Sequence, residues 1–189
     1  MITALRNYPS KSSTRILLVA GLAIFIPVYA YIVRLFSQMG IDTAEFNTVW
    51  LSFDVNQFQV FLQKIIDRGQ VATFLLSYKL NLISMSGFGC AFFALAIILT
   101  RTIPQASRLY KTATAFPIMA VLIAILDIFP SLLLVASASA LPNLSLWVVT
   151  AISGGYLVRI ILLYILLIWF AVVSTKLGKT YYNKITKKT

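Results

Sequence analysis

Four long runs of apolar residues alternate with shorter polar segments along this chain of 189 residues. The runs cover about residues 16–36, 71–100, 112–140 and 145–175, and each could form a helix that crosses the ~30 Å hydrocarbon core of a bilayer. The last three runs are longer than an untilted helix needs, so we expect tilted spans. The pattern predicts an all-α, four-transmembrane-helix bundle that forms a single integral membrane domain over residues 1–189.

The segment between the first two runs has a different pattern, in which apolar residues recur at helical spacing on one face. These residues are Phe58, Phe61, Leu62, Ile65 and Ile66. Asp54 provides a start signal and Gly69 a stop signal, so we predict a short amphipathic, non-cytoplasmic helix over residues 55–68. We expect this helix to rest in the headgroup layer. The alternative is a lid or a partner-docking helix across the outer mouth of the bundle.

The basic residues indicate how the spans are oriented in the membrane. The chain has sixteen Lys and Arg, five Asp and Glu, and a formal net charge of +11. Most of the basic residues flank the apolar runs in three groups: Arg6, Lys11 and Arg15; Arg101, Arg108 and Lys111; Lys176, Lys179, Lys184, Lys187 and Lys188. Basic loops stay in the cytoplasm during insertion, so we expect both termini on the cytoplasmic side of the cell (plasma) membrane.

The same charge distribution bears on the partners of the chain. The basic residues form no continuous stripe with interleaved aromatic residues, so nucleic acid is not an expected partner. Their position at the ends of apolar runs favours anionic headgroups on the cytoplasmic side of the bilayer.

The first apolar run has a second interpretation, as a secretory signal peptide. A basic start, an apolar stretch and the small-residue pattern at 28–30 together resemble a cleavage site. The apolar character continues through Val33, so we prefer a retained membrane anchor. A cleaved chain would have three spans and an outside N-terminus.

Two charged residues lie deep inside the last two runs, Asp127 in the third and Arg159 in the fourth. An unpaired charge at that depth is costly, so we expect the two to meet. Asp127 is about sixteen residues beyond Lys111, and Arg159 is about seventeen residues before Lys176, which gives both a similar depth. The pair is interpreted either as a buried ion pair that fixes helix register or as a polar site for a ligand, an ion or a proton.

The second run contains two further polar residues, Lys79 and Asn81, which are secondary candidates for an intramembrane site. They lie nearer the outer leaflet than the middle of the bilayer. Lys79 can therefore extend its amine to the interface, as long basic side chains commonly do.

Small residues cluster in the second and fourth runs, around Gly87 and at Ser153, Gly154 and Gly155. Without bulky side chains the backbones of membrane helices can approach closely, so we interpret both clusters as helix-packing positions. The alternative for Ser153, Gly154 and Gly155 is a flexible or ligand-accessible notch.

Most catalytic classes lack their residues in this sequence. The chain has no His, and its single cysteine, Cys90, lies inside an apolar run, so we expect no metal, no haem and no other cofactor. Only one acid is deep in the membrane, which excludes a paired-aspartate protease. The GxSxG, P-loop and dinucleotide motifs are also missing, and we therefore expect that the protein is not an enzyme.

Three segments carry a family resemblance: Gln57–Arg68, the sequence SYKLNLISMSGFG at Ser77–Gly89, and ILDIFPSLLL at Ile125–Leu134. Together with the charged fourth run, they resemble a widespread group of uncharacterised four-helix integral membrane proteins. That group typically has an acidic residue in helix three and a basic residue in helix four. Lys79 stands where an acidic residue often occurs in the group, and the group implies no activity.

The sequence therefore favours a non-enzymatic multi-pass membrane protein. Its expected role is to bind a small or lipidic ligand or to support a membrane complex. One alternative is a small ion- or proton-coupled transporter in which Asp127 titrates. Another is an immunity-type protein that binds a pore-forming toxin, because such proteins are also small, basic and four-spanned.

Overall fold

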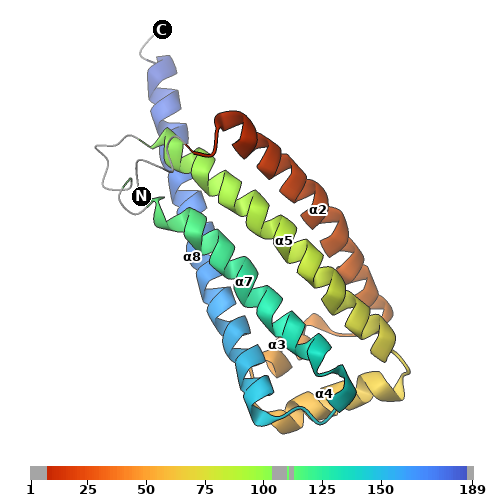
Figure 1. Ribbon diagram of the computed structural model, residues 1–189. Coiled ribbons are helices and arrows are strands. Elements are labelled where there is room, and N and C mark those ends of the chain that lie inside the picture. The colour runs from red at the N-terminus through yellow and green to blue at the C-terminus, as the bar shows by residue number, and fades with distance from the viewer. Residues whose placement is uncertain (1–7, 104–109, 111–112, 187–189) are drawn as a thin grey trace.

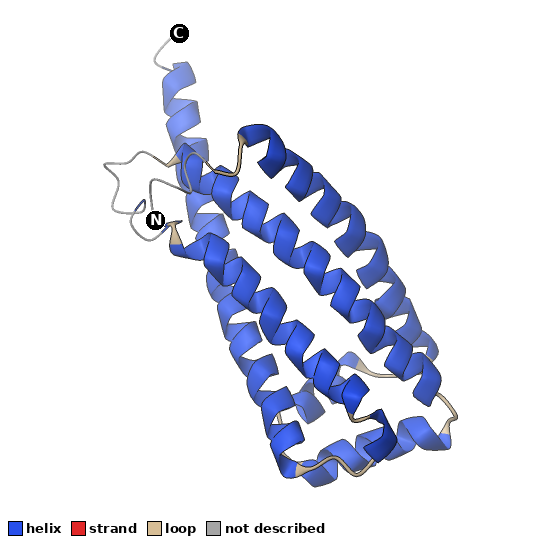
Figure 2. Ribbon diagram, viewed as in Figure 1, coloured by secondary structure: helices blue, strands red, loops and turns tan. Residues whose placement is uncertain are grey.

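The computed structural model describes residues 8–103, 110 and 113–186, and these residues contain helices and no strand (Figure 2). Four of the helices are long and apolar enough to cross a membrane. They are α2 (Lys11–Gln38), α5 (Val71–Thr102), α7 (Ala115–Ala136) and α8 (Leu146–Thr186). The predicted all-α bundle with four apolar helices is confirmed, and the chain is an integral membrane protein by this criterion.

The ends of these helices differ from the predicted spans. α2 begins at Lys11, before residue 16, because the Ser10 side chain caps it by accepting a hydrogen bond from the Ser13 backbone N–H at 3.0 Å. α7 ends at Ala136, and the short helix η1 (Ala138–Ala140) completes the predicted third span. Residue 112, the first of that span, lies outside the described residues.

α8 continues well past residue 175, the predicted end of the fourth span, to Thr186. Apolar composition marks the part of a helix that can sit in hydrocarbon, and it does not mark where the helix stops. Lys and Tyr are compatible with a helix in water, so the basic tail prolongs α8 beyond the apolar run.

Spanning helices that follow each other in the chain also lie side by side in space (Figure 1). α2 packs on α5, α5 packs on α7, and α7 packs on α8, so α2 and α8 form the two outer edges of the bundle. α2 begins and α8 ends at the same end of the bundle. Two short helices, α3 (Thr43–Trp50) and α4 (Val55–Asp67), lie across the opposite end.

The predicted amphipathic helix is present as α4, and it begins and ends where the sequence indicates. The Asp54 side chain accepts a hydrogen bond from the Asn56 backbone N–H at 2.8 Å. At the other end, Gly69 adopts a φ of +67°, a conformation that favours glycine, and its N–H bonds to the carbonyl of Ile66.

The apolar face of α4 packs on the bundle, and the depth of this helix in the headgroup layer stays a prediction. Its apolar face is buried against the protein: Phe58 is fully buried, and Phe61, Leu62 and Ile65 are nearly so. These side chains pack with Phe74 of α5 and with residues of α7 and α8. An amphipathic pattern shows that one face avoids water, but it does not distinguish lipid from protein. α4 therefore lies across the end of the bundle, as in the alternative.

α3 is a helix that we did not predict. Asp42 caps it by accepting a hydrogen bond from the Ala44 backbone N–H at 3.1 Å. Its apolar residues Val49 and Trp50 are buried, and the Trp50 ring stacks on the Phe46 ring with centroids 4.1 Å apart. α3 and α4 together close the end of the bundle with an aromatic cluster.

Small residues hold the spanning helices together at close range. A Cβ atom added to Gly21 would lie 2.6 Å from the Ala91 backbone nitrogen and 2.7 Å from the Gly87 carbonyl oxygen. α2 and α5 therefore cross with their backbones in contact, as expected for Gly87. Gly155 plays the same part between α8 and α7, where an added Cβ would lie 2.9 Å from Pro130.

Candidate functional site

The side chains of Asp127 and Arg159 meet in the interior of the bundle and form an ion pair. α7 and α8 are antiparallel neighbours, so the similar depth inferred from the sequence brings the two groups together. The Asp127 side chain is 10% exposed and the Arg159 side chain 24% exposed. The guanidinium is thus the more accessible member of the pair.

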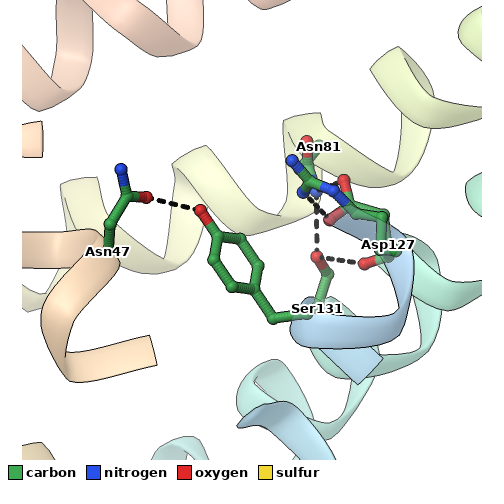
Figure 3. Close-up of polar contacts among 6 residues, drawn as sticks. Asn47, Asn81, Asp127 and Ser131 are labelled. Atoms are coloured by element: carbon green, nitrogen blue, oxygen red, sulfur yellow. Dashed lines mark hydrogen bonds and ion pairs between the residues drawn. The ribbon is translucent and has the colours of Figure 1, made fainter. Parts of the chain in front are cut away.

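Asn81 of α5 completes the environment of the carboxylate (Figure 3). Its amide nitrogen donates to Asp127 Oδ2 and to Ser131 Oγ, with both distances 3.0 Å. The Ser131 hydroxyl donates to the Asp127 backbone carbonyl oxygen at 2.9 Å. Asp127 Oδ1 accepts from Arg159, so both oxygens of the buried carboxylate have donors.

This polar cluster lines a cavity of about 580 Å³. Residues of α2, α5, α7 and α8 form its walls, and residues of α3 line it at the end of the bundle. Much of the lining is aromatic: Tyr29, Phe36, Phe46, Trp50, Tyr78 and Tyr156. The volume lies within the roughly 300–1,000 Å³ typical of small-molecule sites, and aromatic walls with a few convergent polar groups are also typical of them.

Tyr156 connects the ion pair to α3. Its hydroxyl donates a hydrogen bond to Asn47 Oδ1 at 2.5 Å, and Asn47 lies apart from the Asp127 cluster (Figure 3). The Arg159 guanidinium lies over the Tyr156 ring, 4.9 Å from its centroid. A cation over an aromatic face is attracted to the ring, so Tyr156 helps to fix the position of Arg159.

Tyr78 of α5 also lines the cavity, and its hydroxyl is buried. The residue is 7% exposed, and its hydroxyl oxygen has no hydrogen-bond partner among the described residues. A buried hydroxyl without a partner is unusual in a folded protein and calls for an explanation. One explanation is an acceptor supplied by a ligand.

Among the other predicted site residues, Asn81 belongs to the site and Lys79 does not. Lys79 is exposed on α5, does not line the cavity, and has no hydrogen bond or ion pair with the described residues. The two residues are close in sequence but point to different faces of the helix. A helix places residues two apart about 200° from each other, which explains the separation.

The small residues of α8 do not form a notch. Ser153 is fully buried, and Gly155 lies against Pro130 of α7. Neither these two residues nor Gly154 lines the cavity. Gly154 has more room, since a Cβ added there would lie 3.9 Å from its nearest neighbour, Phe53. The packing interpretation therefore fits Gly87 and Gly155, and the notch alternative is not supported.

Several residues of the site were missed in the sequence. Ser131 lies one helical turn after Asp127, and Tyr156 lies three residues before Arg159. Polar groups at these spacings share a face with the charged residue, and this signal could have identified both. For α3, Asp42 followed by Glu45 is a capping signal, and Phe46, Val49 and Trp50 follow at helical spacing.

The described residues contain no group of three or more His, Cys, Asp or Glu side chains that could hold a metal ion. Their polar groups instead form a hydrogen-bonded ion pair beside a cavity, an arrangement suited to binding and orienting a ligand. No protein-family model, curated protein or solved structure matches this chain.

Proposed function

We propose that this protein is a non-enzymatic multi-pass membrane protein that binds a small or lipidic ligand in the cavity between α2 and α8. The observation that carries the proposal is the cavity itself, with an ion pair at its inner end and aromatic walls. Its size and its aromatic lining with a few convergent polar groups fit a small ligand or the polar part of a lipid.

We further propose that the protein lies in the cell membrane with its termini in the cytoplasm. The end of the bundle where α2 begins carries Lys11, Arg15 and Arg101. Four of the five acidic residues lie at the opposite end, in or beside α3 and α4: Asp42, Glu45, Asp54 and Asp67. This asymmetry supports a cytoplasmic basic end facing anionic headgroups and an outer end formed by α3 and α4.

An ion- or proton-coupled carrier that uses Asp127 is less well supported. Both oxygens of its carboxylate accept hydrogen bonds, so the group is held in place rather than free to exchange a cation. A carrier also needs access from both sides of the membrane. The cavity extends from Asp127 toward α3, and its lining residues on α2 and α5 lie in the half of the bundle next to α3.

The experiment is purification in a mild detergent followed by native mass spectrometry of the protein and of whatever accompanies it. Val33→Trp is the informative variant, because Val33 lines the cavity and is half exposed, so the larger ring can enter the mouth. Leu76→Trp is its matched control. Leu76 is similarly exposed on α5 and lies outside the cavity.

The wild-type protein and Leu76→Trp should carry an adduct that Val33→Trp has lost. Equal adducts on all three proteins would mean that the bound molecules coat the surface. Absence of any adduct, together with unchanged thermal stability on adding a membrane lipid extract, would contradict a ligand-binding role.

A further inference from the structure

Three side chains that line the cavity have hydrogen-bond donors without an acceptor among the described residues. Arg159 has five N–H groups, and among the described residues only Asp127 accepts from it. The Tyr78 hydroxyl has no acceptor, and the amide nitrogen of Asn47 also has none among the described residues. Arg159, Tyr78 and Asn47 all line the same cavity.

The carboxylate of the ion pair has its own donors inside the protein. Both oxygens of the Asp127 carboxylate accept hydrogen bonds, and Ser131 Oγ accepts one from Asn81. The second carboxylate of the lining, Asp42, caps α3 in an exposed position where water screens its charge. A ligand with acceptor oxygens would satisfy Arg159 and Tyr78, and a negative charge on that ligand would pair with the guanidinium.

The ion pair also presents its positive member to the cavity. Arg159 and Asp127 both line it, and the guanidinium is the more exposed of the two, at 24% against 10%. A guanidinium can bind two anions at once because its N–H groups point in different directions. An anionic ligand can therefore bind Arg159 while the bond to Asp127 stays in place.

The walls of the cavity include the two edge helices, α2 and α8, which pack on α5 and α7 respectively. Exposed apolar side chains flank this side, among them Tyr29 and Val33 on α2 and Val158 on α8. In a membrane these side chains face lipid tails. An acyl chain attached to a ligand in the cavity can leave it sideways into the bilayer.

We infer that the ligand is an anionic lipid whose headgroup oxygens accept hydrogen bonds from Arg159 and Tyr78 while its acyl chains pass between α2 and α8. This inference rests on the proposed function and specifies the chemical class of its ligand. It also explains the unpartnered hydroxyl of Tyr78 and the exposed apolar residues beside a polar cavity.

The test uses the full-length protein, stripped of lipid in a mild detergent and then incubated with two lipids in equal amounts. Phosphatidylglycerol and phosphatidylcholine with identical acyl chains differ only in their headgroups, and native mass spectrometry counts the lipids retained. Because a hydrogen bond to a charged group is among the stronger polar contacts, we expect retention to favour phosphatidylglycerol roughly tenfold.

Two variants assign the preference to the cavity. Tyr78→Phe removes one hydroxyl that lacks an internal partner, so it should fold and should lower phosphatidylglycerol retention roughly threefold. The double variant Asp127→Asn with Arg159→Gln replaces the ion pair by amides, and it should abolish the preference without leaving a buried charge. Lys79→Gln removes an exposed cation of the same helix outside the cavity, and it should retain the wild-type preference.

The outcomes separate this inference from the proposed function. Equal retention of the two lipids, with both lost in Val33→Trp, would overturn the anionic class and leave the ligand-binding function intact. Loss of preference in Lys79→Gln as large as in the double variant would attribute it to surface charge and overturn the inference. Displacement of phosphatidylglycerol by inorganic phosphate at equal concentration would show that a free anion suffices, and it would overturn the lipid as the ligand. Retention of neither lipid, without any adduct on the purified protein, would contradict both proposals.

Discussion

The half of the bundle next to α3 and the half where α2 begins differ in what lies between the helices. Toward the start of α2, α2 and α5 are in close contact. Gly21 lies against Gly87, and Arg101 donates a hydrogen bond to Thr14 Oγ1 at 3.2 Å. In the other half, the same two helices line a cavity of about 580 Å³. The Gly21 crossing marks the point where backbone contact gives way to aromatic and polar side chains.

This difference shows how a small membrane bundle can keep a ligand-sized space open. Lipid gives little hydrophobic drive for helix association, so stability has to come from close packing and polar contacts. Between α2 and α5, the half where α2 begins supplies the close packing through Gly21 and Gly87. The half next to α3 supplies polar contacts through the Asp127 cluster and is closed by α3 and α4. The following predictions test this division.

The largest effect is expected at the ion pair. Asp127→Ala leaves the Arg159 guanidinium without its counter-ion in the interior, and the free energy of unfolding should fall by ~3–5 kcal/mol. Arg159→Ala should cost less, because the Asp127 carboxylate keeps the hydrogen bond from Asn81. Thermal unfolding in a mild detergent measures both changes.

A double variant tests whether the two residues act together. Asp127→Ala combined with Arg159→Leu removes both charges and should recover part of the stability lost in Asp127→Ala. If the two losses simply add, the ion pair contributes no coupling, and the half next to α3 does not depend on it.

The second effect is expected at the crossing of α2 and α5. Gly21→Ala forces a Cβ atom to within 2.6 Å of a backbone nitrogen and should lower the free energy of unfolding by ~1–3 kcal/mol. Gly154→Ala is the matched control, a helical glycine with its nearest neighbour at 3.9 Å. This change should be neutral or stabilising by up to ~1 kcal/mol, since Ala favours the helix. Equal effects of the two substitutions would contradict close backbone contact at Gly21.

The smallest effect is expected at the ion pair between Glu45 of α3 and Lys64 of α4, which are 2.6 Å apart. Both side chains are more than a third exposed, so water and salt screen the attraction. Lys64→Gln should change the free energy of unfolding by less than ~0.5 kcal/mol. A loss as large as that of Asp127→Ala would mean that α3 and α4 are held by charge rather than by the buried aromatic cluster.

Local patterns determined what could be predicted from the sequence. The four spanning helices follow from runs of apolar residues, and α4 follows from helical spacing between clear start and stop signals. The contact between Asp127 and Arg159 could be anticipated because a charge deep in a membrane needs a partner, and each of two neighbouring helices offered one.

The rest depends on how the helices meet in space. The cavity arises because α2 and α8 are edge helices, and no short pattern in either helix shows which helices it packs against. Gly21 looks like any glycine in an apolar run until α5 lies against it. The protein contacts of the apolar face of α4 could not be predicted for the same reason. Only α3 had a local signal that was overlooked, in Asp42 and Glu45 followed by spaced aromatic residues.

The order of packing along the chain also bears on how the protein is made. Each spanning helix after the first packs on the one synthesised before it, so α8 joins the others last. Asp127 therefore precedes its counter-ion, Arg159, in the order of synthesis. Its hydrogen bonds with Asn81 and Ser131 need only α5 and α7. Of the two, only the Asn81 amide donates to the carboxylate, at Oδ2, and the final helix brings the guanidinium to Oδ1.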